Sequence, residues 1–109
     1  MALLDFYQGT TKKFDGQVLY NGINPDITDD NILFIVKKNH DDLDSQAIIS
    51  ANADVSSSGS TGIWKIDLTP EITDVTPGNY YYEIVWTKED GEIYVIDGGI
   101  VGIKDKLSD

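Results

Sequence analysis

The chain has 109 residues, and its 19 acidic against eight basic side chains give a net charge of −11. That length supports one domain with one core, and the negative charge excludes binding to a nucleic-acid backbone. Because the chain has no cysteine, disulfide scaffolds, thiolate metal sites and cysteine nucleophiles are excluded as well.

The start of the chain lacks the basic segment of a signal peptide and reaches Asp5 after only four residues. The longest apolar run, Ile32–Val36, is far shorter than the roughly 20 residues that a membrane helix needs. We therefore expect no signal peptide and no contact with a membrane.

β-branched and aromatic residues outnumber the helix-forming residues, which predicts an all-β chain. Phe14–Tyr20 is the first strand that we expect. Ile32–Lys38 is apolar on both faces, which is typical of a central strand, and Gln46–Ala53 is its expected hairpin partner. The polar tract Ser56–Gly62 is expected to be a flexible loop.

The segments that follow alternate apolar and polar residues with a period of two. In Trp64–Leu68 this alternation predicts a strand with one buried face. Pro70–Asp74 predicts a single helical turn, because proline suits the first helical position and acids suit a helix N-terminus. In the strand Tyr80–Thr87, the face expected to be buried carries Tyr80, Tyr82, Ile84 and Trp86.

The last expected strands form a hairpin with Tyr80–Thr87. Lys88–Glu92 contains an Asp-Gly pair, which tolerates the positive φ of tight turns, so we expect Ile93–Ile96 to pair antiparallel with that strand. The Gly98-Gly99 pair allows a bulge before Ile100–Lys104. About seven short strands favour an antiparallel β-sandwich, built as a single domain over residues 1–109 with a core at 6–104.

Aspartates gather in two loops, and hard oxygen ligands of this kind are what Ca²⁺ requires. The candidate ligands are Asp26, Asp29, Asp41, Asp42 and Asp44. The spacing of an EF-hand is absent, however, and aspartate is also a common turn former. We therefore expect no metal and no other cofactor.

The only histidine, His40, precedes the second of these loops and could bind a metal or relay a proton. A lone loop histidine without a second catalytic group is more often an ordinary solvated residue, and no Gly-x-Ser-x-Gly elbow presents a serine. We therefore expect no catalytic residue and no enzymatic activity.

The tyrosines are the remaining candidates for function. Tyr81 and Tyr94 fall on the opposite parity from the expected core positions, so we expect them to be exposed and to contact a partner protein or a glycan. Tyr80 or Tyr82, which follow a Pro-Gly pair, is expected to brace the preceding loop as a tyrosine corner.

Five motifs follow one another along the chain: Phe6–Thr11, Pro25–Thr28, Gly62–Thr73, Pro77–Ile84 and Asp97–Ile103. In this order they resemble the immunoglobulin-like modules of bacteriophage tail and baseplate proteins, and are similar to the N-terminal domain of baseplate upper proteins. Thr10 and Asp29 stand where that family usually has Asp and Gly. The resemblance implies an immunoglobulin-like antiparallel β-sandwich of about seven strands.

The same resemblance implies a non-enzymatic structural protein of the virion, made in the host cytoplasm and acting by protein–protein assembly. The expected partners are other virion proteins and further copies of the chain, in a homo-oligomer. Two alternatives stay open. One is a carbohydrate-binding module for host attachment, which would use exposed Tyr81, Tyr94 or a tryptophan, and the other is a capsid decoration protein.

Overall fold

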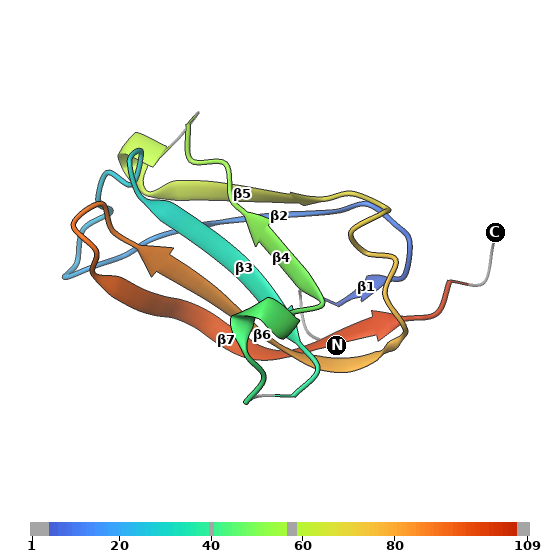
Figure 1. Cartoon of the computed structure of the whole chain (residues 1–109). Coiled ribbons are helices and arrows are strands. Elements are labelled where there is room, and N and C mark those ends of the chain that lie inside the picture. Colours follow the sequence, from blue (N-terminus) through green and yellow to red (C-terminus); the bar gives the residue numbers. More distant parts are fainter. Residues whose placement is uncertain (1–4, 40, 57–58, 107–109) are drawn as a thin grey trace.

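The chain folds as an all-β structure, as its composition predicts. The computed structural model describes residues 5–39, 41–56 and 59–106, and within these ranges it has seven strands, two short 3₁₀ helices and no α-helix (Figure 1). The helices are η1 (Asp44–Gln46) and η2 (Gly59–Thr61). The strands are β1 (Phe6–Tyr7), β2 (Lys12–Gln17), β3 (Asn31–Lys37), β4 (Ile49–Asn52), β5 (Ile63–Leu68), β6 (Gly78–Thr87) and β7 (Ile93–Lys104).

The strands form two sheets. Five of them form one sheet in the order β1-β7-β6-β3-β4, and β2 pairs with β5 in a separate two-stranded ribbon. Neighbouring strands are antiparallel except β1, which runs parallel to the end of β7. The prediction of a purely antiparallel arrangement is therefore wrong at this edge. The reason is that β1 and β7 come from opposite ends of the chain, so no hairpin connects them.

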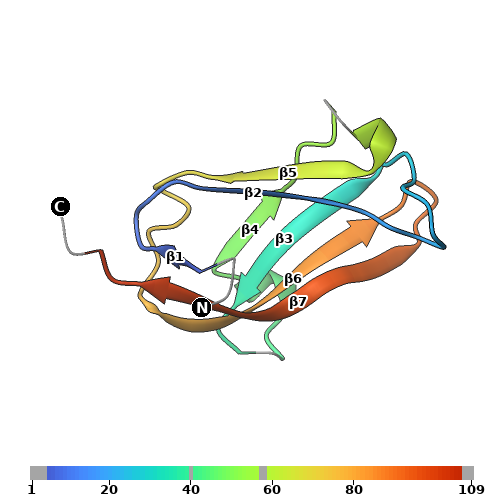
Figure 2. The ribbon, with the colours of Figure 1, turned by 180° about the vertical axis from the view of Figure 1, so that it is seen from behind.

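The larger sheet is curled, and the ribbon of β2 and β5 lies across its inner side (Figures 1 and 2). Along one edge of the ribbon, backbone hydrogen bonds join β5 to the segment that follows β4 of the larger sheet. The Asp54 N–H donates to the Lys65 carbonyl at 2.7 Å, and the Lys65 N–H donates to the Asp54 carbonyl at 3.0 Å. Along the other edge of the ribbon, β2 and β7 do not pair with each other, and a groove lies between them.

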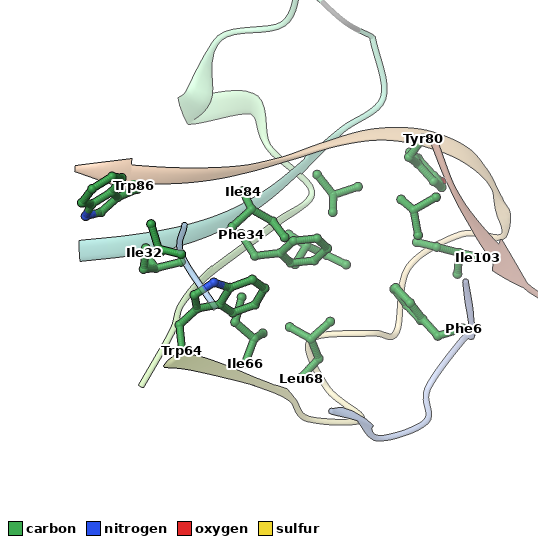
Figure 3. Close-up of a cluster of buried hydrophobic side chains, with 14 of the residues drawn as sticks. Phe6, Ile32, Phe34, Trp64, Ile66, Leu68, Tyr80, Ile84, Trp86 and Ile103 are labelled. Atoms are coloured by element: carbon green, nitrogen blue, oxygen red, sulfur yellow. The ribbon is translucent and has the colours of Figure 1, made fainter. Parts of the chain in front are cut away.

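The core fills the space between the larger sheet and the ribbon. In β5 the buried residues Trp64, Ile66 and Leu68 alternate with exposed ones, as the sequence predicts. Fully burying a side chain of this size contributes about 1.5–3 kcal/mol, so each layer stabilises the other. The larger sheet contributes Ile32, Phe34, Val36, Tyr80, Ile84, Trp86, Val101 and Ile103 (Figure 3).

The first strand of the ribbon ends earlier than predicted. β2 is Lys12–Gln17 rather than residues 14–20. The Asn21-Gly22 pair has φ angles of 52° and 79°, and this left-handed turn directs Tyr20 to pair with Ile23 instead of continuing the strand. The local turn preference therefore outweighs the apolar pattern.

β4 is the hairpin partner of β3, as predicted, with different bounds. β3 is a central strand between β6 and β4. β4 is shorter than the expected range 46–53, because η1 occupies residues before it. In the tract expected to be a loop, η2 forms at Gly59–Thr61, and the Gly59 carbonyl accepts the Ile27 N–H at 2.8 Å; Ser57 and Ser58 lie outside the described residues.

β6 and β7 pair antiparallel, as predicted, but β7 is one continuous strand. Its bulge lies two residues before the expected Gly98-Gly99 pair. Val95 pairs with Val85 and Asp97 pairs with Ile84, so Ile96 is the extra residue. The bulge allows both Tyr94 and Ile96 to pack against the core.

A single helical turn follows β5, as predicted. The Thr73 N–H donates to the Thr69 carbonyl at 3.1 Å. Thr73 is fully buried, and its hydroxyl donates to the Thr10 carbonyl at 2.6 Å. The turn therefore holds the segment that leads into β2.

Candidate functional site

The surface of the larger sheet that faces away from the core carries solvent-exposed apolar residues. Leu33 of β3 pairs with Val85 of β6, which pairs with Val95 of β7, so an apolar row crosses three strands. Ile93 and Ile100 lie on the same side, and the exposed fractions of Ile93, Val95 and Ile100 are 66%, 57% and 58%. We call this surface the outer face and define it as Leu33, Ile35, Tyr81, Val85, Ile93, Val95 and Ile100.

Tyr81 lies on the outer face, where 42% of its surface is exposed and its strand partner is Ile100. Beside these two residues is a hollow of about 310 Å³ over Gly98 and Gly99, and Gly98, which faces it, has no side chain to fill it. Glu83 is the carboxylate that borders this hollow. The outer face thus combines exposed apolar side chains with an indentation large enough for one side chain of a partner.

Tyr94 does not share this surface. It pairs with Trp86 in the hairpin register, so it lies on the core side of the sheet and is only partly exposed. The expected parity is therefore wrong for Tyr94, because the turn length sets the register. Its ring centroid lies 5.3 Å from that of Trp86 and 5.4 Å from that of Tyr20. The hydrogen bond with Tyr20 has the largest effect in raising the pKa of Tyr94, and the hydrogen bond with Glu92 has the next largest.

The four aromatic residues considered for sugar stacking do not lie in one exposed row. Tyr81 and Tyr94 lie on opposite faces of the larger sheet. Trp64 and Trp86 are buried. Lys88 also covers the aromatic cluster at the hairpin, because its Nζ lies 5.9 Å from the ring centroid of Trp86 and 5.9 Å from that of Tyr20.

Tyr80 and Tyr82 have different hydrogen-bond partners. The Tyr80 hydroxyl donates to the Thr76 carbonyl four residues upstream, which is the hydrogen bond of a tyrosine corner. The Tyr82 hydroxyl instead donates to the Asp97 carboxylate at 3.3 Å. Burial, and secondarily the Asp97 charge, raises the pKa of Tyr82.

The candidate Ca²⁺ ligands lie in loops at opposite ends of β3, one before and one after it. A strand of seven residues spans about 20 Å, so the two loops cannot supply one ion. In the first loop Asp26 accepts the Thr28 amide at 2.9 Å and the Thr28 hydroxyl at 2.6 Å, and these bonds lower the Asp26 pKa. Asp29, beside it, is exposed.

In the second loop Asp42 accepts the Asn39 amide at 3.0 Å, and Asp41 is exposed. Asp44 lies in η1. His40 lies outside the described residues. Within residues 5–39, 41–56 and 59–106, no group of three or more histidine, cysteine, aspartate or glutamate residues is placed to hold a metal ion.

The groove between β2 and β7 has an apolar floor and an acidic rim. Its volume is about 900 Å³, and residues 14–20 and 94–97 form its walls. Asp15 and Asp97 are among the lining residues, whereas no basic side chain is. The floor is formed by Trp64, Tyr82, Ile84 and Trp86.

Apart from the exposure of Tyr81, neither the apolar outer face nor the groove was expected from the sequence. One signal for the outer face is the unbroken apolar run from Ile93 to Ile96, because a strand with one solvated face should alternate. No helix in the described part of the chain is long and apolar enough to cross a membrane. Comparison with family models and with curated protein sequences finds no match to this chain.

Proposed function

We propose that this chain is a non-enzymatic assembly module of a bacteriophage virion, part of the tail or baseplate and made in the host cytoplasm. The five motifs within residues 6–103 that resemble the phage modules support this proposal. The proposal includes the finer fold assignment, an immunoglobulin-like sandwich. Its support is a ribbon that faces the larger sheet across one core and the hydrogen bond from Tyr80 to Thr76.

The outer face is the observation that carries the proposed function. The solvated face of an antiparallel sheet normally presents polar residues, whereas Ile93, Val95 and Ile100 are each more than half exposed. Contiguous exposed apolar surface of this kind marks interaction sites. We therefore assign the outer face to contacts with further copies of the chain, in a homo-oligomer, and with other virion proteins.

The test of assembly is sedimentation velocity of the wild-type chain and of Ile100→Lys. We expect the wild type to form a discrete oligomer, and more of it at higher salt, because a net charge of −11 on each copy is then screened. Ile100→Lys should be monomeric. Thr11→Lys adds the same charge at an exposed position away from the outer face and should assemble like the wild type. A wild-type chain that stays monomeric at high concentration contradicts self-assembly.

The test of location is mass spectrometry and immunogold labelling of purified phage particles. We expect the chain in the particle, with label on the tail or baseplate. Label on the head would instead identify a capsid decoration protein, and absence from particles contradicts a virion role. A glycan array that gives hits abolished by Tyr81→Ala would favour the host-attachment alternative.

A further inference from the structure

Both strands that border the groove present an unpaired backbone edge. β2 pairs only with β5. The Val18 N–H donates to the Gly62 carbonyl at 2.8 Å, so the even-numbered residues of this segment bond toward β5. By the alternation of antiparallel ladders, the amides and carbonyls of Lys13, Asp15 and Gln17 point away from β5. That direction is toward the groove, which Asp15 and Gln17 line.

The facing part of β7 is open in the same way. The Lys88 N–H donates to the Glu92 carbonyl at 2.8 Å, so Lys88 and Glu92 form a hydrogen-bonded pair of the β6–β7 ladder. Because every second pair of an antiparallel ladder is hydrogen-bonded, the amides and carbonyls of Ile93 and Val95 point away from β6. Val95 also lines the groove, so its backbone is available to a strand that lies there.

Beyond the bulge, two outward-facing amides of β7 are already occupied. The Gly98 amide donates to the Asp97 carboxylate at 2.8 Å, and the Gly102 amide donates to the Asp5 carboxylate at 2.8 Å. Bulges and carboxylates at strand edges prevent unwanted strand pairing. The part of β7 that borders the groove, Ile93 and Val95, lacks such carboxylate partners among the described residues.

The groove floor also contains a buried donor without an acceptor among the described residues. Trp64 is 6% exposed, and its Nε1 has no hydrogen-bond partner among the described residues. Figure 3 shows this nitrogen on the edge of the indole that is turned toward Ile32 and Ile84. Buried donors are nearly always bonded, so this nitrogen is an unfavourable feature of the packing beneath the groove.

We infer that the groove receives an extended segment of a partner protein, which adds a strand between β2 and β7. An extended chain fills about 160 Å³ per residue, from its rise, strand spacing and sheet spacing. A groove of about 900 Å³ therefore holds roughly five or six residues. This inference rests on the proposed function, because it names the kind of partner that an assembly module would bind.

The groove also defines the chemistry of the segment. Side chains that face inward are apolar, because they meet the aromatic floor. Side chains at the rim are basic, because Asp15, Asp97 and the net charge of −11 attract cations. A glycan fits less well, since Trp64 and Trp86 expose almost no ring surface for stacking.

The test is a selection from a yeast-displayed library of random peptides of about nine residues, long enough to span the groove. With this chain as bait, we expect enriched peptides that alternate apolar and polar residues and carry a positive charge. Each should slow hydrogen exchange at the amides of Lys13, Asp15 and Val95. No enrichment, or unchanged exchange at these amides in the complex, overturns the inference.

Asp15→Pro removes an amide that faces the groove and leaves the β2–β5 ladder intact, since proline is tolerated where an edge amide faces outward. We expect it to weaken peptide binding about tenfold, the effect of one or two hydrogen bonds. Asp15→Asn keeps the amide and should weaken binding less, mainly at low salt. Circular dichroism checks that both variants fold, and equal binding by a folded Asp15→Pro variant overturns the inference.

The outer-face variant Ile100→Lys separates this inference from the proposed function. Ile100 does not line the groove, so the variant should lose self-association and keep full peptide binding. Normal self-association without peptide binding refutes the groove inference alone. Peptide binding by a wild-type chain that neither self-associates nor occurs in particles refutes the proposed function alone.

Discussion

The Asp30 carboxylate bonds the indole of Trp86 at the end of β6. Asp30 Oδ2 accepts the Trp86 Nε1–H at 2.8 Å, and Asp30 Oδ1 accepts the Glu89 amide at 2.9 Å. One side chain therefore joins the loop before β3 to the β6–β7 hairpin, next to the groove that Trp86 lines.

Asp30→Ala should lower the free energy of unfolding by about 1–3 kcal/mol, because the buried Trp86 donor would lose a charged acceptor. Urea denaturation followed by tryptophan fluorescence measures this change. Asp29→Ala, at the neighbouring exposed position, is the control and should stay within about 0.5 kcal/mol of the wild type. Equal losses in the two variants would show that the Asp30–Trp86 bond contributes nothing.

Tyr80→Phe and Tyr82→Phe make the same chemical change at two positions of one strand. Tyr80 is buried and its hydroxyl bonds the Thr76 carbonyl, so its loss should cost about 1 kcal/mol. The Tyr82 bond to Asp97 is longer, 3.3 Å, and exposed to solvent, so its loss should cost less. Thermal unfolding of both variants ranks them, and the reverse order would rule out a stabilising tyrosine corner.

The predictable parts of the fold are the strands that bury one face against the core and expose the other. The alternation in β5 and β6 identified their buried faces, since a strand against a core shows the period directly. The curl of the larger sheet and the two-residue pairing of β1 with β7 depend on contacts between distant segments. Local patterns contain no information about such contacts.

The candidate site was less predictable, for two physical reasons. The face on which Tyr94 lies depends on the hairpin register, which the turn sets, so counting parity along one strand was insufficient. The acidic loops are close in sequence, but β3 extends between them and holds them apart. The apolar outer face is a third case, because an apolar residue on the outward side of a strand and one in the core give the same local pattern.

Gly16 packs against the indole of Trp64, so Gly16→Ala should be destabilising. A Cβ at Gly16 would lie 2.4 Å from Trp64 Cζ2, and overpacking of this kind costs about 1–3 kcal/mol. At Gly99 the nearest atom, Tyr82 Cε1, is at 3.4 Å, an ordinary contact, so Gly99→Ala should be tolerated. Urea denaturation compares the two. In a Trp64→Phe background the cost of Gly16→Ala should shrink, and a cost that stays the same would exclude the clash as its cause.

The Asp54 carboxylate should make stability depend on pH in acid. It accepts the Ser56 hydroxyl at 2.6 Å and the Ser56 amide at 2.8 Å, and these bonds lower the Asp54 pKa from its ordinary value of 3.8. Because the pKa is lower in the folded than in the unfolded chain, folding favours the ionised form. The stabilisation is complete well above pH 3.8 and is lost as the pH falls through the folded-state pKa.

Ser56→Ala removes the hydroxyl that contributes most to this shift. The wild type should therefore have the higher unfolding midpoint at neutral pH, and the difference should shrink between about pH 4 and pH 2. Thr28→Ala is a second instance, because Asp26 accepts the Thr28 hydroxyl and amide in the same geometry and its pKa is also lowered. Differences that stay constant down to the acid limit would mean that the hydroxyls stabilise these turns independently of the carboxylate charge.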